Sequence, residues 1–100
     1  MNYKDLNPEA FKKAMAENDN VVLLDVRTPG EVAQGKIEGA VAIDFFADDF
    51  QTQVSALDKD KNYFVYCRSG QRSGQACQLM HQLGFQSLVN LEGGILAWNA

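Results

Sequence analysis

Residues 61–84, KNYFVYCRSGQRSGQACQLMHQLG, form the stretch of sequence that decides the fold. The uninterrupted apolar run 63–66 is typical of a strand that is buried on both faces. Residues 73–83 then carry apolar side chains at helical spacing, and Gly84 suits the left-handed position that often follows a helix. We therefore expect a strand and a helix joined by the short loop 67–72.

The rest of the chain repeats this alternation of strand-like and helix-like segments. Strands are expected at 21–24, 41–43, 63–66 and 88–89, and helices at 8–17, 29–34, 47–54, 73–83 and 95–98. Asn7 and Pro8 are typical of a helix start, while Thr28 and Glu31 form the pattern of a capping box. This order predicts an α/β fold with a mostly parallel sheet and helices on both of its faces.

Length and composition narrow the possible functions. The 100 residues suffice for a single domain, 1–100, and the net charge of −4 argues against nucleic acid or an anionic membrane as a partner. No apolar run approaches the ~20 residues of a membrane span, and the first residues do not resemble a secretory signal. We therefore expect a cytoplasmic protein with reduced thiols. One histidine and two cysteines ten residues apart predict neither a metal site nor another cofactor.

The charges are unevenly distributed along the chain. Residues 61–91 contain no Asp or Glu, and Lys61, Arg68 and Arg72 give this segment a charge of +3. The remaining residues carry −7, from six basic and thirteen acidic side chains. This pattern fits either a chance grouping on a solvated surface or a local anion site on an acidic protein.

Cys67 occupies a position that favours the thiolate. It follows a buried strand and precedes a helix whose first N–H groups carry partial positive charge, and Arg68 and Arg72 lie nearby in sequence. Gly70 permits backbone angles that let successive N–H groups of the loop turn toward an anion. Ser73 is expected to cap the following helix. We therefore predict a reactive cysteine in a loop that stabilises negative charge on the sulfur.

The simpler interpretation is that Cys67 is a small buried apolar residue, but two flanking arginines would then need partners in the core. Cys77 receives the opposite interpretation, because it lies on the predicted helix beside Ala76 and Met80 and suits a packing role. A role as a second redox thiol stays open for Cys77. His81 is expected to be an exposed helix residue.

The spacing of the loop bears on which anion it holds. Protein tyrosine phosphatases use a cysteine, an anion-binding loop and an arginine in the pattern C-x5-R. Here four residues separate Cys67 from Arg72, and Ser73 stands at the position of the phosphatase arginine. A ring of N–H groups that is one residue shorter should fit a single sulfur atom on the cysteine better than a tetrahedral phosphate.

Three motifs together resemble the single-domain rhodaneses, a family of thiosulfate and related sulfurtransferases. LLDVRTPGEVAQGKIEGAVAI (23–43) is similar to the family pattern D-V-R-x-P-x-E-[FY]-x-x-G-H-I-x-G-A-x-x-I, and VYCRSGQRS (65–73) contains the active-loop pattern C-x-x-G-x-R. LEGGILAW (91–98) matches L-x-G-G-x-x-x-W. Val32, Lys36 and Glu38 depart from the usual aromatic residue, histidine and proline of the first motif.

The resemblance implies a three-layer α/β/α sandwich around a mostly parallel sheet of about five strands. It also implies that Cys67 takes a sulfur atom from a small anionic donor such as thiosulfate, and that a small-molecule or protein thiol, or cyanide, then accepts it. The six-residue active loop would run from Cys67 to Arg72. The N–H groups that surround the transferred sulfur would be those of Arg68, Ser69, Gly70, Gln71, Arg72 and Ser73. Arg68 and Arg72 would attract and orient the donor.

Asp25 and Arg27 are carried over from the resemblance as scaffold residues. From spacing alone, Arg27 is expected to pair with Glu31, four residues further on, and the alternative is that Asp25 and Arg27 are ordinary surface charges. Two other functions stay open: a docking or regulatory module that uses the same fold without catalysis, and a cysteine phosphatase or arsenate reductase that uses the same loop.

Overall fold

The apolar strand that ends at Cys67 lies in the centre of the sheet. In the computed structural model, which describes residues 2–100, five strands pair in the order β1-β5-β4-β2-β3, and every pairing within these residues is parallel. The strands are β1 (Lys4–Leu6), β2 (Val21–Asp25), β3 (Val41–Ala42), β4 (Asn62–Tyr66) and β5 (Leu88–Leu91). The α/β fold with a parallel sheet is confirmed.

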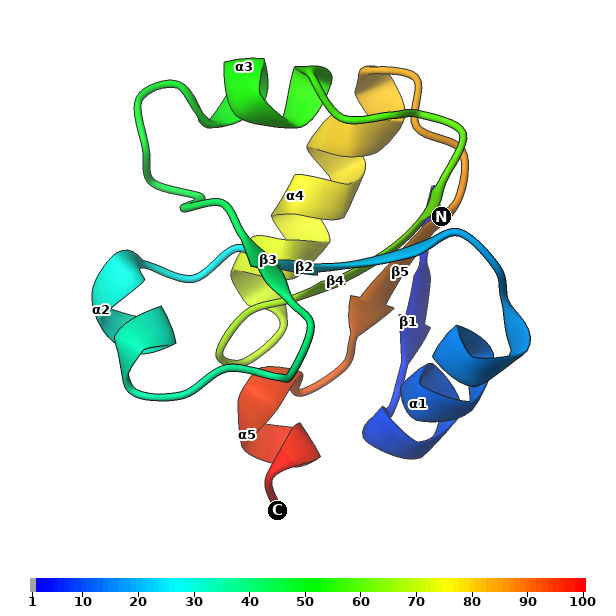
Figure 1. The fold of residues 1–100 in the computed structure, drawn as a ribbon, viewed down its shortest axis with the longest axis vertical. Helices are drawn as coiled ribbons and strands as arrows, with labels where there is room; N and C mark the ends of the chain where they lie inside the picture. The colour runs from blue at the N-terminus through cyan, green and yellow to red at the C-terminus, as the bar shows by residue number, and fades with distance from the viewer. Residues whose placement is uncertain (1) are drawn as a thin grey trace.

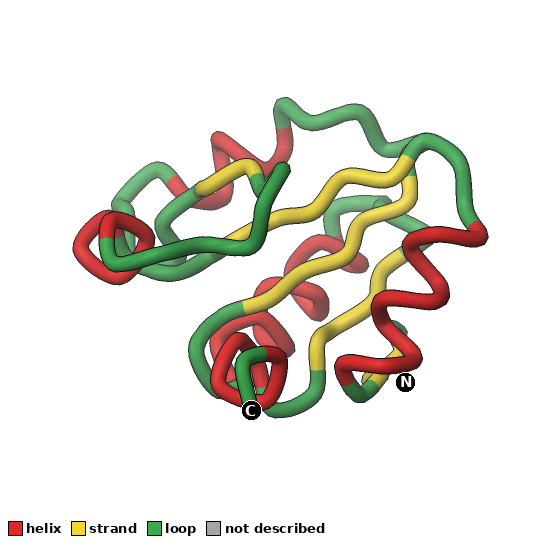
Figure 2. Tube along the Cα trace, turned by 60° about the horizontal axis from the view of Figure 1, so that its bottom comes forward, coloured by secondary structure: helices red, strands yellow, loops and turns green. Residues whose placement is uncertain are grey.

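Helices cover both faces of the sheet (Figure 1). They are α1 (Pro8–Glu17), α2 (Pro29–Ala33), α3 (Phe50–Ser55), α4 (Gln71–Gln82) and α5 (Gly94–Trp98). The helices α3 and α4 lie on one side of the strands, and α1 and α5 lie on the other. Figure 2 shows the strands running side by side as one layer between them. The predicted three-layer arrangement is therefore present.

Each layer of helices buries its own apolar cluster against the sheet. On the α4 face, Leu24 and Val65 of the strands pack with Cys77 and Met80 of the helix. On the α1 face, Leu23 and Phe64 pack with Phe11 of α1, whose ring meets Phe64 edge to face at 5.3 Å between centroids. Consecutive strand residues point to opposite faces, which explains why the strands are apolar without alternation.

The predicted helix starts are confirmed where a side chain caps the helix. The Asn7 side chain accepts a hydrogen bond from the Ala10 N–H, and Pro8 opens α1. Thr28 and Glu31 form the expected capping box at α2. Gly84, with φ of +101°, directly follows Leu83, the C-cap residue of α4.

One strand was not predicted, and several predicted boundaries differ from those of the structure. The edge strand β1 was not expected, because its residues Lys-Asp-Leu carry no apolar run and become a strand only by pairing with β5. The strand β5 continues through Asn90 and Leu91, since a buried asparagine interrupts the apolar pattern but not the pairing. The helix α3 begins at Phe50 rather than at residue 47, after a turn.

Within residues 2–100, none of the helices combines the length and the apolar character needed to cross a lipid bilayer.

Candidate active site

Cys67 lies at the carboxyl end of the central strand β4, where α/β folds commonly place their sites. Its side chain is fully buried, and its sulfur accepts hydrogen bonds from two groups of the loop. The Gly70 N–H lies 3.1 Å from Cys67 Sγ, and the Ser73 hydroxyl lies 3.3 Å from it. The loop therefore folds around the sulfur, as the sequence predicts.

Two opposing influences set the pKa of Cys67. Burial acts most strongly and disfavours the charged thiolate. The Ser73 hydroxyl, followed by the backbone N–H groups of Ser73, Gly70 and Ser69, favours the thiolate, and together these groups outweigh burial. The pKa of Cys67 consequently lies below the usual value for a thiol, which favours the thiolate, the nucleophilic form of the sulfur.

The helix α4 starts earlier than expected, and this changes the role of Ser73. The helix begins at Gln71, and Gly70 occupies the capping position with φ of +99° in the left-handed region. The prediction that Ser73 caps the helix is therefore wrong. Ser73 lies within the first turn, fully buried, and its hydroxyl points at Cys67 Sγ instead of at a backbone N–H. Because α4 starts at Gln71, Ser73 lies in its first turn and its hydroxyl is a second hydrogen-bond donor to Cys67 Sγ.

The amino end of α5 holds the loop from outside. The Ile95 N–H donates to the Cys67 carbonyl at 2.9 Å, and the Leu96 N–H donates to the Arg68 carbonyl at 3.2 Å. In a trans peptide the carbonyl and the following N–H point in opposite directions, so these bonds turn the next N–H groups away from α5. One of these, the Ser69 N–H, is among the groups that lower the pKa of Cys67. The third sequence motif thus shapes the active loop.

Gly94 makes this contact possible. It has φ of +64°, and a Cβ atom there would collide with backbone atoms of Arg68 and would lie 2.6 Å from the Cys67 carbonyl oxygen. A side chain is therefore excluded at this position, and α5 can approach the loop closely.

Asn90 supports the loop from the neighbouring strand β5. It is almost fully buried, and its Nδ2 donates to the Gly70 carbonyl at 3.1 Å and to Asp5 Oδ1 at 2.9 Å. By the same peptide geometry, fixing the Gly70 carbonyl also fixes the direction of the Gln71 N–H. Asn90 Oδ1 has no hydrogen-bond partner among the described residues.

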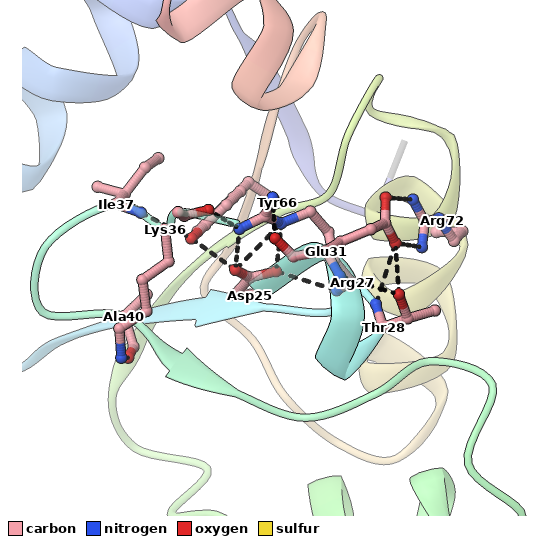
Figure 3. Close-up of polar contacts among 10 residues, drawn as sticks. Asp25, Arg27, Thr28, Glu31, Lys36, Ile37, Ala40, Tyr66 and Arg72 are labelled. Carbon is pink, nitrogen blue, oxygen red and sulfur yellow. Dashed lines mark hydrogen bonds and ion pairs between the residues drawn. The ribbon is translucent and has the colours of Figure 1, made fainter. Parts of the chain in front are cut away.

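The two arginines of the loop have different surroundings. Arg68 is exposed and borders an open depression of about 440 Å³ that Lys36, Leu96 and Trp98 also line. Arg72 is only partly exposed, and its guanidinium binds the carboxylate of Glu31 through two hydrogen bonds of 2.7 and 2.9 Å (Figure 3). The donor-binding role of both arginines stays a prediction, and for Arg72 Glu31 is a competing partner.

Glu31 joins the loop to α2. One of its carboxylate oxygens also accepts from the backbone N–H and the hydroxyl of Thr28, each at 3.1 Å. The hydrogen bonds from Arg72 are the main influence that lowers the pKa of Glu31 to about 2, against the opposing effect of burial. The ion pair is therefore present throughout the neutral range.

Asp25 and Arg27 form a buried ion pair beneath this site. Arg27 Nη2 lies 2.8 Å from Asp25 Oδ2, and the two side chains are 6% and 0% exposed. The expected pair between Arg27 and the Glu31 carboxylate is wrong, since Arg27 reaches only the Glu31 backbone carbonyl, at 3.4 Å. The alternative that Asp25 and Arg27 are surface charges is wrong as well, because both side chains are buried. Arg27 pairs with Asp25, two residues before it at the end of β2, and not with the carboxylate of Glu31, four residues after it.

The Tyr66 hydroxyl completes this buried network (Figure 3). It donates to Asp25 Oδ2 at 2.8 Å and accepts from the Ile37 N–H at 3.1 Å. Burial is the main cause that raises the pKa of Tyr66 to about 12. The network ties the residue before Cys67 to the first sequence motif, so Asp25 and Arg27 act on the site through structure rather than by contact with the sulfur.

Two candidates of the sequence analysis remain, Cys77 and His81. Cys77 is fully buried in the apolar cluster on the α4 face, and burial is the main cause that raises its pKa to about 12. Its predicted packing role is confirmed. His81 is exposed on α4, as expected.

Sequence reasoning missed Asn90 and the part that Glu31 plays at the loop. A polar residue inside the apolar run 88–91 was the only signal for Asn90. Glu31 was recognised only as a capping residue, and nothing in the sequence links it to Arg72, 41 positions away.

Comparison with known proteins agrees with this geometry. The sequence profile of the Rhodanese-like domain matches residues 7–100. The chain is 38% identical to a sulfurtransferase of Allochromatium vinosum, over 94% of this chain and 86% of that protein. It is 40% identical to YtwF, a putative sulfurtransferase of Bacillus subtilis, over 98% of this chain and 92% of that protein.

A solved structure gives the same result for the fold. The rhodanese-related protein of Thermoplasma volcanium superposes with a TM-score of 0.82 and 31% identity, covering 97% of this chain and 91% of that one. Profile, relatives and fold agree over almost the whole length, and the chain belongs to the rhodanese-like domain family.

Proposed function

We propose that this protein is a sulfurtransferase that carries sulfur as a persulfide on Cys67, from thiosulfate or a similar donor to a thiophilic acceptor. The observation that carries the proposal is the surroundings of Cys67 Sγ, which accepts hydrogen bonds from the Gly70 N–H and the Ser73 hydroxyl and has a lowered pKa. These are the properties that a sulfur nucleophile requires.

In the first step the Cys67 thiolate attacks the outer sulfur of the donor. With thiosulfate, a new sulfur–sulfur bond forms to Cys67, the sulfur–sulfur bond of thiosulfate breaks, and sulfite leaves with the electron pair of that bond. The persulfide that remains carries the negative charge on its outer sulfur. The exposed guanidinium of Arg68 would draw an anionic donor toward the loop.

In the second step a thiolate or cyanide attacks the outer sulfur of the persulfide. The bond to Cys67 breaks, the acceptor leaves with the extra sulfur, and the Cys67 thiolate is regenerated. Donor and acceptor thus react in turn with one residue, which gives ping-pong kinetics. The cycle needs no cofactor besides the covalent persulfide.

The N–H groups of the loop would stabilise the charge on the persulfide. The Gly70 N–H already donates to Cys67 Sγ, and the bonds from α5 and Asn90 hold the carbonyls of the loop in place. Fixed donors of this kind lower the energy of a developing anion without reorganisation, as in an oxyanion hole. A reducing compartment such as the cytoplasm would keep Cys67 as a thiol between cycles.

The size of the loop favours sulfur over phosphate. Ser73 occupies the position of the phosphatase arginine, and its hydroxyl lies 3.3 Å from the sulfur. A phosphate on Cys67 would therefore meet a short hydroxyl donor, instead of the two-pronged guanidinium that suits phosphate oxygens.

Initial-rate kinetics with thiosulfate and cyanide test the proposal. We expect parallel double-reciprocal lines, complete loss of thiocyanate formation in Cys67→Ser, and retention in Cys77→Ala. Transfer that survives Cys67→Ser would contradict the proposal. Cys67-dependent hydrolysis of an aryl phosphate would favour a phosphatase, and partner binding that Cys67→Ala leaves intact, with no turnover of any sulfur donor, would favour a docking module.

A further inference from the structure

An open depression of about 440 Å³, lined in part by residues of α2 and α5, lies beside the active loop. Arg68, which directly follows Cys67, lines it, and so do Ile95 and Leu96 of α5. The N–H groups of these two α5 residues donate to the carbonyls of Cys67 and Arg68, at 2.9 and 3.2 Å. The depression is therefore continuous with the loop that holds the sulfur.

Lys36 and Arg68 give this depression two positive charges. Both residues are exposed, and neither belongs to an ion pair among residues 2–100. The other two charged residues of the lining, Arg27 and Glu31, each belong to one of the two ion pairs of the site, so their charges are already compensated. The depression thus presents two uncompensated cations to an anion that enters it.

Lys36 is a departure of this chain from the rhodanese pattern, which usually has histidine at this position. A histidine is mostly neutral above pH 7, whereas a lysine keeps its charge. The Lys36 ammonium donates one hydrogen bond, to the Ala40 carbonyl at 3.2 Å (Figure 3). Because an ammonium group has three donors, two are left for a ligand. The departure therefore adds a permanent positive charge beside the active loop.

The lining also suits the carbon skeleton of an organic ligand. Leu96 is 51% exposed, and Trp98 forms another part of the lining. Ligand sites commonly combine such apolar surface with a few charged groups that fix orientation. A small organic molecule with a carboxylate matches both features, since its carbon atoms can contact the apolar side chains while its anionic end faces the two cations.

We infer that this depression binds the carboxylate of the sulfur acceptor, so that the preferred acceptor is a thiol that carries a carboxylate and Lys36 is a specificity-determining residue for it. The inference rests on the proposed function and narrows its acceptor. Lys36 and Arg68 would hold the carboxylate beside the loop, and the thiol of the same molecule would then meet the persulfide on Cys67.

The transfer step is balanced without any further reactant. The acceptor thiolate attacks the outer sulfur of the protonated persulfide on Cys67 and forms a sulfur–sulfur bond to it. The sulfur–sulfur bond of the protein persulfide breaks, and the Cys67 thiolate leaves with the electron pair. The product is the protonated persulfide of the acceptor, R–S–SH, and no oxidant or reductant is consumed.

The test measures this second step alone. Protein loaded with a persulfide on Cys67 is freed of donor and mixed with N-acetylcysteine or with its amide, in which an uncharged carboxamide replaces the carboxylate. Intact mass against time gives the second-order rate constant for loss of the sulfur. Each constant is expressed per thiolate, so that the different acidity of the two thiols does not enter. The carboxylate-to-amide ratio of the constants reports recognition of the carboxylate.

Two substitutions at Lys36 separate its charge from its contact with Ala40. Lys36→His installs the residue of the family pattern and is largely neutral at pH 8, whereas Lys36→Arg keeps the charge. We expect a carboxylate-to-amide ratio above one in wild type and in Lys36→Arg. In Lys36→His the ratio should fall about three- to fivefold at low salt, as for one charge about 5 Å from the carboxylate in a medium close to water, and salt should shrink the difference.

Lys61→His is the matched control. Lys61 is exposed too, but it lies just before β4, at the opposite end of the strand from Cys67. It makes the same charge change and should leave the ratio as in wild type.

The outcomes separate this inference from the proposed function. A wild-type ratio of one or below, or a ratio that Lys36→His leaves unchanged, would overturn the role of the depression only. An equal fall in Lys61→His or in Lys36→Arg would overturn it too, because the local charge of Lys36 would then not be the cause. A persulfide that cyanide removes but neither thiol removes would contradict the inference and leave the proposed function standing. If no donor placed sulfur on Cys67, both would fail together.

Discussion

At the scale of single residues, the sulfur of Cys67 combines burial with several hydrogen-bond donors. Burial alone would make the thiol inert, as it does for Cys77, whose pKa is raised to about 12. The difference between the two cysteines is the set of loop donors, with Ser73 as the one side chain among them. The loop that surrounds the Cys67 sulfur could be predicted because it is continuous in sequence, although the way in which Ser73 acts could not.

Ser73→Ala should raise the pKa of Cys67. The change removes a hydrogen bond to a charged sulfur, and such a bond corresponds to about one pKa unit or more. The rate of iodoacetamide alkylation against pH, measured in a Cys77→Ala background, reports this pKa. Ser69→Ala is the control, because Ser69 donates through its backbone N–H. An alkylation profile that is the same with and without the Ser73 hydroxyl would contradict the role of Ser73.

The ionisation of Glu31 also makes the free energy of unfolding depend on pH in the acid range. Its pKa falls from 4.5 to about 2 on folding, chiefly through Arg72, so its ionised form stabilises the native state above pH 4.5. That contribution is lost as the pH falls from 4.5 toward 2. Allowing for solvent screening, we expect Glu31→Gln to lower the free energy of unfolding by about 1–2 kcal/mol at neutral pH.

Denaturant unfolding across this range of pH measures the effect. The difference in free energy of unfolding between wild type and Glu31→Gln should shrink as the pH falls below 4.5, since glutamine does not titrate. A difference that stays constant from neutral pH down to pH 2 would show that the variant acts through something other than the ion pair.

At the scale of elements, the active loop depends on the contact between its outer side and the start of α5. The N–H groups of Ile95 and Leu96 hold the loop carbonyls, and Gly94 leaves room for this approach. Sequence analysis could predict the strand, the loop and the helix that follows, because their apolar patterns are local. It could not predict β1 or the contact with α5, because both depend on pairing between distant segments.

Gly94→Ala should weaken both the fold and the site. A methyl group would collide with the Arg68 backbone, and the positive φ alone adds about 1–3 kcal/mol of strain. We expect a lower free energy of unfolding and a higher pKa of Cys67, measured by denaturant unfolding and by alkylation. Gly30→Ala is the control, since a Cβ there would meet nothing within 4 Å. If the two alanine variants behaved alike, the contact between α5 and the loop would not have the importance assigned to it.

At the scale of the whole molecule, one sheet serves two apolar clusters. Neighbouring residues of β2 and β4 point to opposite faces, with Leu24 and Val65 on one side and Leu23 and Phe64 on the other. Loss of either helical layer would expose strands that the other layer also needs, so unfolding should be cooperative. The layered fold could be predicted from sequence because apolar runs and helical periods alternate along the entire chain.

Cys77 offers a direct probe of that cooperativity. It is fully buried on the α4 face, so its alkylation requires opening of this layer. In a Cys67→Ala background, the denaturant midpoint for Cys77 labelling should coincide with the midpoint from circular dichroism. Labelling that precedes the loss of helical signal would mean that the α4 layer opens independently.

The central claim is that Cys67 carries the transferred sulfur, and intact-mass measurement after a single exposure to donor tests it most directly. Protein incubated with thiosulfate or with a persulfide should gain the mass of one sulfur atom, located on Cys67 by peptide mapping, and should lose it when cyanide or a thiol is added. Cys67→Ser should gain nothing. Absence of the added mass with every donor, or its persistence in Cys67→Ser, would contradict the account.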